Sequence, residues 1–173
     1  MSPGDARQTI FIRLLLILAV AYTAWSYMNR GGVGEGHAAP EIELSQLLQA
    51  PQNLKRSLRS IRDKYVVLDF WATWCGPCVQ SIPHLNQLAG AFEDQPVQFI
   101  AITEENEATV TPFLDRYPIN AWVGLDHDGQ TFRAFGVKSI PTTFVIGPDG
   151  RILRRSHPME LTEAKLAGLI GAD

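Results

Sequence analysis

Eight residues in the middle of the chain, Trp71-Ala72-Thr73-Trp74-Cys75-Gly76-Pro77-Cys78, constrain the fold more than any other stretch. They follow the apolar run Tyr65–Phe70, which is typical of a buried strand. After the cysteines, apolar residues recur at spacings of three and four, as on one face of a helix: Val79, Ile82, Leu85, Leu88 and Phe92. The sequence therefore predicts that both cysteines lie in the first turn of a helix that follows a central strand.

The start of a helix favours a thiolate at Cys75. The first helical N–H groups have no partners within the helix, and the helix dipole is positive at this end. The thiolate is the form that attacks a disulfide. Cys78, three residues on, lies on the same helix face, close enough to form a short ring with Cys75. Pro77 stiffens the loop, and Gly76 leaves room for the backbone of a partner.

Two other uses of a Cys-x-x-Cys pair remain open at this point, half of a zinc site and a structural disulfide. Zinc normally takes four ligands, and the chain has no second cysteine pair. A three-residue separation closes a loop too short to constrain the unfolded chain much. Because the chain contains two cysteines, any intramolecular disulfide must join Cys75 to Cys78. Beside a strand and a helix, a redox-active pair is the favoured interpretation.

The same stretch resembles the active site of the thioredoxin superfamily, and Cys-Gly-Pro-Cys is the arrangement of thioredoxin itself. Asp69, six residues before Cys75, corresponds to the buried acid beneath the thioredoxin disulfide. Pro83 matches the proline that kinks the active-site helix. The run Ile140-Pro141-Thr142-Thr143 resembles the cis-proline loop, which lies against the disulfide and pairs with the substrate backbone.

This resemblance implies a complete site that needs no metal and no organic cofactor besides the redox-active disulfide. Its members would be the catalytic residues Cys75, Cys78 and Asp69, the active-site loop residues Trp74, Gly76 and Pro77, and the substrate-binding residues Ile140, Pro141 and Thr142. Burial in an apolar strand should raise the pKa of Asp69, so that it can accept the proton of Cys78. Thioredoxin has a lysine near this acid, whereas the strand Phe99–Ile102 offers none.

The chain before residue 39 predicts an attachment to a membrane. We expect a cytoplasmic segment at 1–9, a transmembrane anchor or signal segment at 10–28, a flexible tether at 29–38 and a thioredoxin-like domain at 39–173. As a helix, 10–28 would be about 28 Å long, close to the thickness of the hydrocarbon core. A cleaved signal peptide is the alternative, since Ala19-Val20-Ala21 has the small-x-small form of a cleavage site.

Ala39–Leu44 resembles the entry segment of the membrane-anchored, extracytoplasmic thioredoxin-like proteins of bacteria, the TlpA and ResA type. Two features depart from that type. Many relatives carry a glutamate three residues after the second cysteine, tied to selectivity for cytochrome c maturation, and Ser81 cannot supply that carboxylate. A β-hairpin is usual between Ser45 and Lys64, whereas residues 54–64 show a helical pattern with a basic outer face, interpreted as solvated.

The remaining patterns predict an α/β, thioredoxin-like fold, a mixed sheet flanked by helices on both faces with a central helix–strand insertion near 109–125. The expected elements are strands at 97–103 and 121–125, helices at 107–117, 132–137 and 161–170, and a hairpin of 143–146 with 152–155. Glu104 and Glu105 end the strand at 97–103 and could approach the site, but surface charges are the favoured interpretation.

We therefore expect a thiol–disulfide oxidoreductase that reduces disulfides of extracytoplasmic proteins through Cys75 and Cys78. It would be anchored by a single helix in a bacterial cytoplasmic membrane, with the domain in the periplasm or extracytoplasmic space. Its partners would be protein thiols and disulfides and a membrane electron donor. The net charge of −3 gives no reason to expect nucleic acid. The alternative is a non-catalytic module that senses oxidation or handles a soft metal.

Overall fold

The structure, a computed structural model, describes residues 12–23, 33–42, 44–51, 61 and 63–171. The chain divides into two units, Met1–Gly32 and Val33–Asp173. In the first unit, 12–23 are helical. Of the predicted membrane segment 10–28, residues 10–11 and 24–28 lie outside the described residues, as do residues 29–32 of the predicted tether. Within the described ranges, no helix combines the length and hydropathy needed to cross a bilayer.

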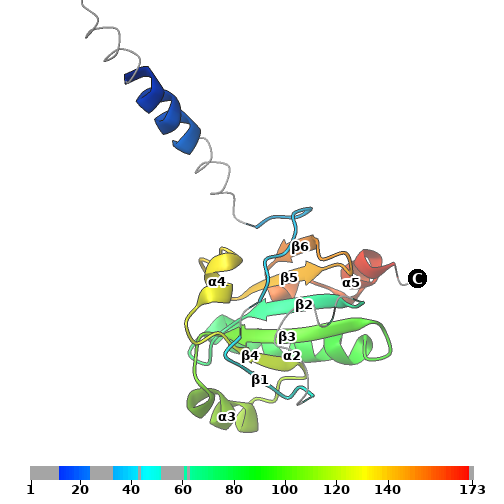
Figure 1. The fold of residues 1–173 in the computed structure, drawn as a ribbon. Coiled ribbons are helices and arrows are strands. Elements are labelled where there is room, and N and C mark those ends of the chain that lie inside the picture. The colour runs from blue at the N-terminus through cyan, green and yellow to red at the C-terminus, as the bar shows by residue number, and fades with distance from the viewer. Residues whose placement is uncertain (1–11, 24–32, 43, 52–60, 62, 172–173) are drawn as a thin grey trace, which may run out of the picture. The chain divides into compact units, whose positions relative to one another are not determined.

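The second unit is built on one six-stranded sheet with the order β1-β4-β3-β2-β5-β6 (Figure 1). The strands are β1 (Gln46–Leu48), β2 (Tyr65–Phe70), β3 (Val97–Thr103), β4 (Trp122–Leu125), β5 (Thr142–Ile146) and β6 (Ile152–Ser156). β2, β3 and β4 run parallel, whereas β1, β5 and β6 each pair antiparallel with their neighbours. The helices are α2 (Gly76–Ala91), α3 (Glu107–Arg116), α4 (Gln130–Ala134), the 3₁₀ turn η2 (Pro158–Glu160) and α5 (Glu163–Ile170). The predicted mixed sheet is confirmed.

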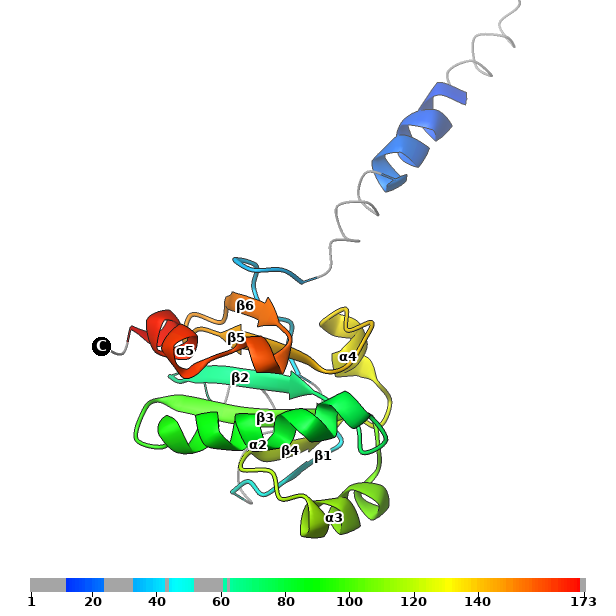
Figure 2. The ribbon, with the colours of Figure 1, turned by 180° about the vertical axis from the view of Figure 1, so that it is seen from behind.

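Alternation along β2 assigns the two faces of the sheet. Val66, Leu68 and Phe70 point to the face covered by α4 and by the segment that contains Ile42 and Leu44. The intervening positions point to the opposite face, where Val67 packs against residues of α2 and α5. Figure 2 shows α2 and α5 in front of this second face. Helices therefore cover both faces, and Asp69 lies on the α2 side.

The predicted strand–loop–helix unit around the cysteines is confirmed. β2 ends at Phe70, the peptide N–H of Trp71 still donates to the carbonyl of Ile102 in β3 (3.0 Å), and α2 begins at Gly76. Cys75 is the N-cap of α2, and Pro83 lies inside the helix. Because strand, loop and helix are consecutive in sequence, local patterns were sufficient to predict their positions.

Elsewhere the structure refines the predicted elements. The short helix expected at 132–137 is α4, which begins two residues earlier at Gln130. The closing helix begins at Glu163, after the separate turn η2. β1 was not predicted, because its three residues form a strand only through pairing with β4. Of the helix expected at 54–64, residues 54–60 and 62 lie outside the described residues.

Asp126, in the turn before α4, explains the earlier start of that helix. The residue is fully buried, and its two carboxylate oxygens accept the N–H groups of Thr131 (3.0 Å) and Phe132 (2.9 Å). These are N–H groups at the start of a helix, where no helical carbonyl can serve them. One carboxylate thus replaces the side-chain cap that Gly129, the N-cap residue, cannot provide.

Replacing Asp126 by alanine is expected to lower the free energy of unfolding by about 2–3 kcal/mol, because two buried N–H groups lose a charged acceptor. Urea denaturation followed by circular dichroism measures the change. Asp128→Ala is the matched control, since Asp128 is exposed in the same turn and its removal should cost less than about 0.5 kcal/mol. Equal losses for the two variants would contradict the capping role of Asp126.

Candidate active site

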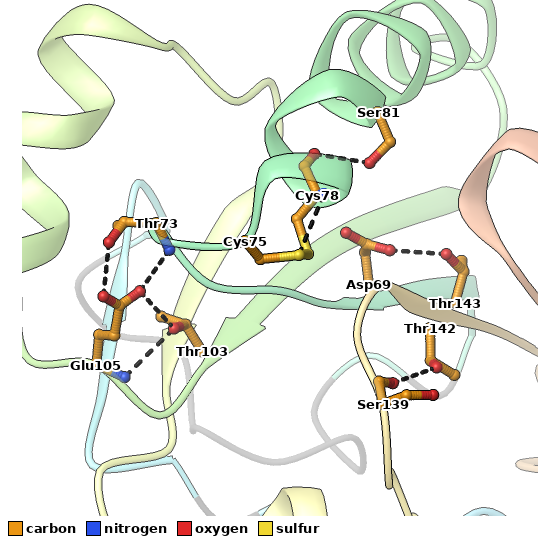
Figure 3. The surroundings of a disulfide bond; sticks show 10 residues. All are labelled: Asp69, Thr73, Cys75, Cys78, Ser81, Thr103, Glu105, Ser139, Thr142 and Thr143. Carbon is orange, nitrogen blue, oxygen red and sulfur yellow. Dashed lines mark hydrogen bonds between the residues drawn. A yellow bond between two sulfur atoms is a disulfide. The ribbon is translucent and has the colours of Figure 1, made fainter.

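The two cysteines form a disulfide at the N-terminus of α2, with an S–S distance of 2.04 Å (Figure 3). The peptide N–H of Cys78 donates to Sγ of Cys75 over 3.2 Å. This N–H belongs to the first turn of the helix and has no carbonyl to bond there. In the reduced protein the same N–H and the helix dipole would stabilise a thiolate at Cys75. The geometry thus favours Cys75 as the nucleophile.

The two cysteine residues also differ slightly in exposure. The exposed fraction is 5% for Cys75 and 1% for Cys78, so Cys78 is the more enclosed. The residues around Cys75 are open to solvent: Trp74 is 74% exposed, and Gly76 and Pro77 are exposed as well. A Cβ atom added at Gly76 would meet no atom within 4 Å, so the surface beside the disulfide is clear for an approaching chain. The open surface beside the disulfide is therefore on the side of Cys75.

Asp69 lies beneath the disulfide on the side of β2 that α2 covers, next to Cys78 in Figure 3. It is buried, and Oγ1 of Thr143 donates to its Oδ1 over 2.7 Å. The two residues are opposite each other in the antiparallel pair of β2 and β5, which explains the contact. Burial raises the pKa of Asp69 from 3.8 to about 7, although the hydrogen bond from Thr143 lowers it. The carboxyl group can therefore exchange a proton near neutral pH.

A small cavity borders Asp69. Its volume is about 20 Å³, and its lining includes Leu85, Asn86 and Asn120. This volume is sufficient for about one water molecule. Asn86, which lines the cavity, accepts a hydrogen bond from the N–H of Asn120 (2.7 Å) and donates one to the carbonyl of Pro118 (2.8 Å).

The loop before β5 provides the other side of the site. The Ile140–Pro141 peptide bond is cis, as the resemblance implied, and β5 begins at the next residue, Thr142. Oγ1 of Thr142 donates to the carbonyl of Ser139 over 2.7 Å, which closes the loop on itself. Ile140 also packs against both the core cluster of Cys75 and that of Phe70. The structure thus brings the loop to the disulfide.

A cleft of about 380 Å³ lies between this loop and Trp74. Its lining includes Trp74, Glu104, Phe132, Val137, Lys138 and Ile140. An exposed indole ring and apolar side chains form the walls, with one acid and one base among them. Glu104 thus remains an exposed charge, as expected, but it borders the cleft beside the disulfide.

Ser81 stands where many relatives of the TlpA and ResA type carry a glutamate. Its side chain is fully buried, and Oγ donates to the carbonyl of Cys78 over 2.8 Å. The hydroxyl group is thereby used within the helix and offers no charge to a substrate.

The interpretation of Glu105 as a surface charge is wrong. Glu105 is half-buried and accepts two hydrogen bonds from Thr73, in the loop that leads to Cys75. No local sequence pattern indicates this contact, because the two residues are 32 positions apart and follow different strands. The order of parallel strands offers a partial signal, since Thr73 and Glu105 each follow the C-terminal end of neighbouring strands β2 and β3.

Among the described residues, no group of three or more His, Cys, Asp and Glu side chains is arranged to hold a metal ion. The Cys-x-x-Cys pair is closed as a disulfide in this structure.

Residues 35–155 match the model of the AhpC/TSA family. The chain belongs to this family. It is 33% identical to the thiol-disulfide oxidoreductase ResA of Geobacillus thermodenitrificans over 144 residues, which cover 82% of this chain and 80% of the relative. It is 32% identical to ResA of Bacillus subtilis, over 86% of this chain and 84% of the relative.

Among solved structures, the chain is similar to a Chlorobium tepidum protein assigned as the thiol:disulfide interchange protein DsbE. The TM-score is 0.68 and the identity is 32%, with 79% of this chain and 99% of the other covered. The thioredoxin-like fold is thereby confirmed. The chain is a thiol–disulfide oxidoreductase of the ResA and DsbE type, with Cys75–Cys78 as its disulfide.

Proposed function

We propose that this protein reduces disulfides of extracytoplasmic proteins by dithiol exchange. The observation that carries the proposal is the position of Cys75 at the N-cap of α2, where the N–H of Cys78 points at its sulfur. This position supports a thiolate nucleophile. The exposed surface beside it, formed by Trp74, Gly76 and Pro77, supports a protein as the partner.

The reaction follows from the order of the two sulfurs. The Cys75 thiolate attacks one sulfur of the substrate disulfide, forms a mixed disulfide and expels the other substrate sulfur as a thiolate. Cys78 then gives its proton to Asp69 and attacks the sulfur of Cys75, which releases the second substrate thiolate. The substrate gains two electrons, and the protein keeps the Cys75–Cys78 disulfide. Ile140, Pro141 and Thr142 would offer backbone groups to an extended substrate segment.

Regeneration requires a reductant, since the proposed compartment is oxidising. We propose a membrane electron donor of dithiol type, and a membrane anchor in residues 10–28 that keeps the domain close to it. The apolar composition of that segment supports the anchor. Cell fractionation tests it: the full chain should sediment with membranes, whereas a chain lacking residues 1–31 should not. Recovery of the full chain in the soluble fraction would contradict the anchor.

The reduction potential of the Cys75–Cys78 pair is expected near that of thioredoxin, about −270 mV. The Gly-Pro dipeptide between the two cysteines resembles that of the reducing members of the superfamily. Equilibration of the protein with dithiothreitol and glutathione buffers, followed by alkylation and mass spectrometry, measures the potential. A value near −120 mV would instead identify an oxidant and contradict the proposed direction.

Turnover separates this proposal from a sensing or metal-handling module. With dithiothreitol as the reductant, the protein should reduce many equivalents of insulin disulfide per Cys75–Cys78 pair. A protein that reacts once and stops would support the non-catalytic alternative.

A further inference from the structure

Glu105 is hydrogen-bonded to Thr73, in the loop that leads to Cys75 (Figure 3). Its Oε2 accepts the peptide N–H of Thr73, and its Oε1 accepts the hydroxyl group of the same residue, each over 2.6 Å. Both distances are at the short end for hydrogen bonds to a carboxylate, which are the strong ones. Thr73 is two residues before Cys75, so this pair of bonds fixes the backbone directly before the nucleophile.

The carboxylate is itself held by the sheet. Oγ1 of Thr103, the last residue of β3, donates to Oε2 of Glu105 and accepts the N–H of Glu105, each over 3.3 Å. Thr103 is fully buried. The connection therefore runs from a rigid strand through one carboxylate to the active-site loop.

The loop has few other attachments of this kind. The peptide N–H of Trp71 donates to the carbonyl of Ile102 in β3, and the peptide N–H of Cys75 donates to the carbonyl of Ala72 within the loop. The carbonyl of Cys75 accepts the N–H of Val79 in α2. Between them lies Trp74, which is 74% exposed and forms one wall of the cleft beside the disulfide. Because Trp74 directly follows Thr73, the hydrogen bonds that hold Thr73 also fix the position of the Trp74 wall.

We propose that Glu105 is a positioning residue that presets the loop from Thr73 to Cys75 for protein substrates. The inference rests on the proposed thiol–disulfide exchange and names a residue that serves it without touching either sulfur. A carboxylate suits this position because both of its oxygens accept, which matches the two donors of Thr73. Glutamine offers one acceptor, but the Thr73 hydroxyl can turn to accept from its amide, so Glu105→Gln should keep part of the attachment.

The expected signature is a difference between large and small substrates. Glu105→Ala should raise KM for insulin about tenfold with little change in kcat, because only a fraction of the molecules then presents the loop correctly. The second-order rate with a small disulfide, 5,5′-dithiobis(2-nitrobenzoate), should stay within about twofold, since it requires the sulfur but not the cleft wall. Glu105→Gln should lie between wild type and Glu105→Ala.

Two further variants control the experiment. Glu107→Gln removes a charge from an exposed position two residues on, with no contact to Thr73, and should match wild type. Thr73→Val removes the hydroxyl donor alone. Introduced into the wild type, it should cause part of the rise in KM for insulin, and introduced into Glu105→Ala it should cause no further rise. Exchange of the Thr73 amide proton, followed by NMR, should be faster in Glu105→Ala, which reports the attachment without any activity.

The outcomes separate this inference from the proposed function. A wild-type protein inactive on insulin would contradict the function, while faster exchange of the Thr73 amide in Glu105→Ala would still support the attachment. If the wild type is active, two results would overturn the positioning role. One is that Glu105→Ala and Glu105→Gln lose equal activity on insulin and on the small disulfide. The other is that neither variant loses activity on insulin. If Glu105→Ala fails to fold, Thr73→Val and Glu105→Gln carry the same comparison.

Discussion

Cys75→Ser is expected to lower the rate of insulin reduction on the order of 10³-fold or more. A serine hydroxyl is not ionised at neutral pH and cannot replace the thiolate that attacks the substrate. The sulfur of Cys75 is the one that accepts the N–H of Cys78 at the helix N-terminus, and the residues on either side of Cys75 are exposed. Insulin precipitation with dithiothreitol as the reductant measures the loss. Gln80→Ala, an exposed change in the same helix, is the matched control and should keep the wild-type rate.

A substitution of the second cysteine, Cys78→Ser, tests which cysteine attacks the substrate first. Cys78→Ser should still attack the substrate but cannot release it, so a covalent mixed disulfide should accumulate. Mass spectrometry under non-reducing conditions should find this adduct in Cys78→Ser and not in Cys75→Ser. Accumulation of the adduct in Cys75→Ser alone, or equally in both, would reverse or remove the assignment of roles.

Asp69→Asn is expected to slow the resolving step on the order of 10–100-fold at pH 7, because the amide cannot accept the proton of Cys78. In the wild type, the rate should rise with pH around 7, where the buried carboxyl group loses its proton. The variant should lack this rise. Single-turnover kinetics of the mixed disulfide between pH 5.5 and 8.5 measure both effects. An unchanged pH profile would contradict the role of Asp69.

The same change should stabilise the fold at high pH. The pKa of Asp69 is raised to about 7 in the folded protein, against an ordinary value of 3.8, so the folded state binds the proton more tightly than the unfolded state. Between these two values the unfolded state binds fewer protons, and stability falls as pH rises. The loss approaches roughly 4 kcal/mol above pH 7. Asp69→Asn removes the ionisation, so its advantage over wild type should grow from pH 4 to pH 8.

Thr143 provides an internal control for Asp69. Its hydroxyl group donates to the carboxylate and lowers the pKa of Asp69, against the effect of burial. Thr143→Val keeps the shape of the side chain and removes the donor. The rise in the resolving rate should then shift to higher pH. A shift to lower pH would contradict the cause given for the pKa.

The residues of the active-site loop could be predicted because their chemistry and their positions are both local. A strand ending at Phe70 and a helix starting at Gly76 leave Cys75 at the helix N-terminus whatever the rest of the chain does. Hydrophobic periodicity, the proline and the glycine all indicate the same boundary. The helix α4 shows the limit of such local reasoning, since a buried acid four residues before it fixed its start.

Side-chain contacts between distant segments could not be predicted from local sequence patterns. Asp69 and Thr143 face each other because β2 and β5 pair in one register, and a shift by one residue would turn Thr143 to the other face. Glu105 meets Thr73 because parallel strands β2 and β3 end side by side.

Sequence patterns were enough to predict the cysteine pair at the start of a helix and Asp69 in the strand before it, because these residues lie within a single strand–loop–helix segment. The hydrogen bond from Thr143 to Asp69 and the carboxylate that holds Thr73 emerged only from the three-dimensional structure, whereas the cis-proline loop at Pro141 was expected from the family resemblance. The physical reason is that periodicity and capping act over a few residues. The tuning contacts instead depend on strand order and register, which are set by burial of the whole sheet.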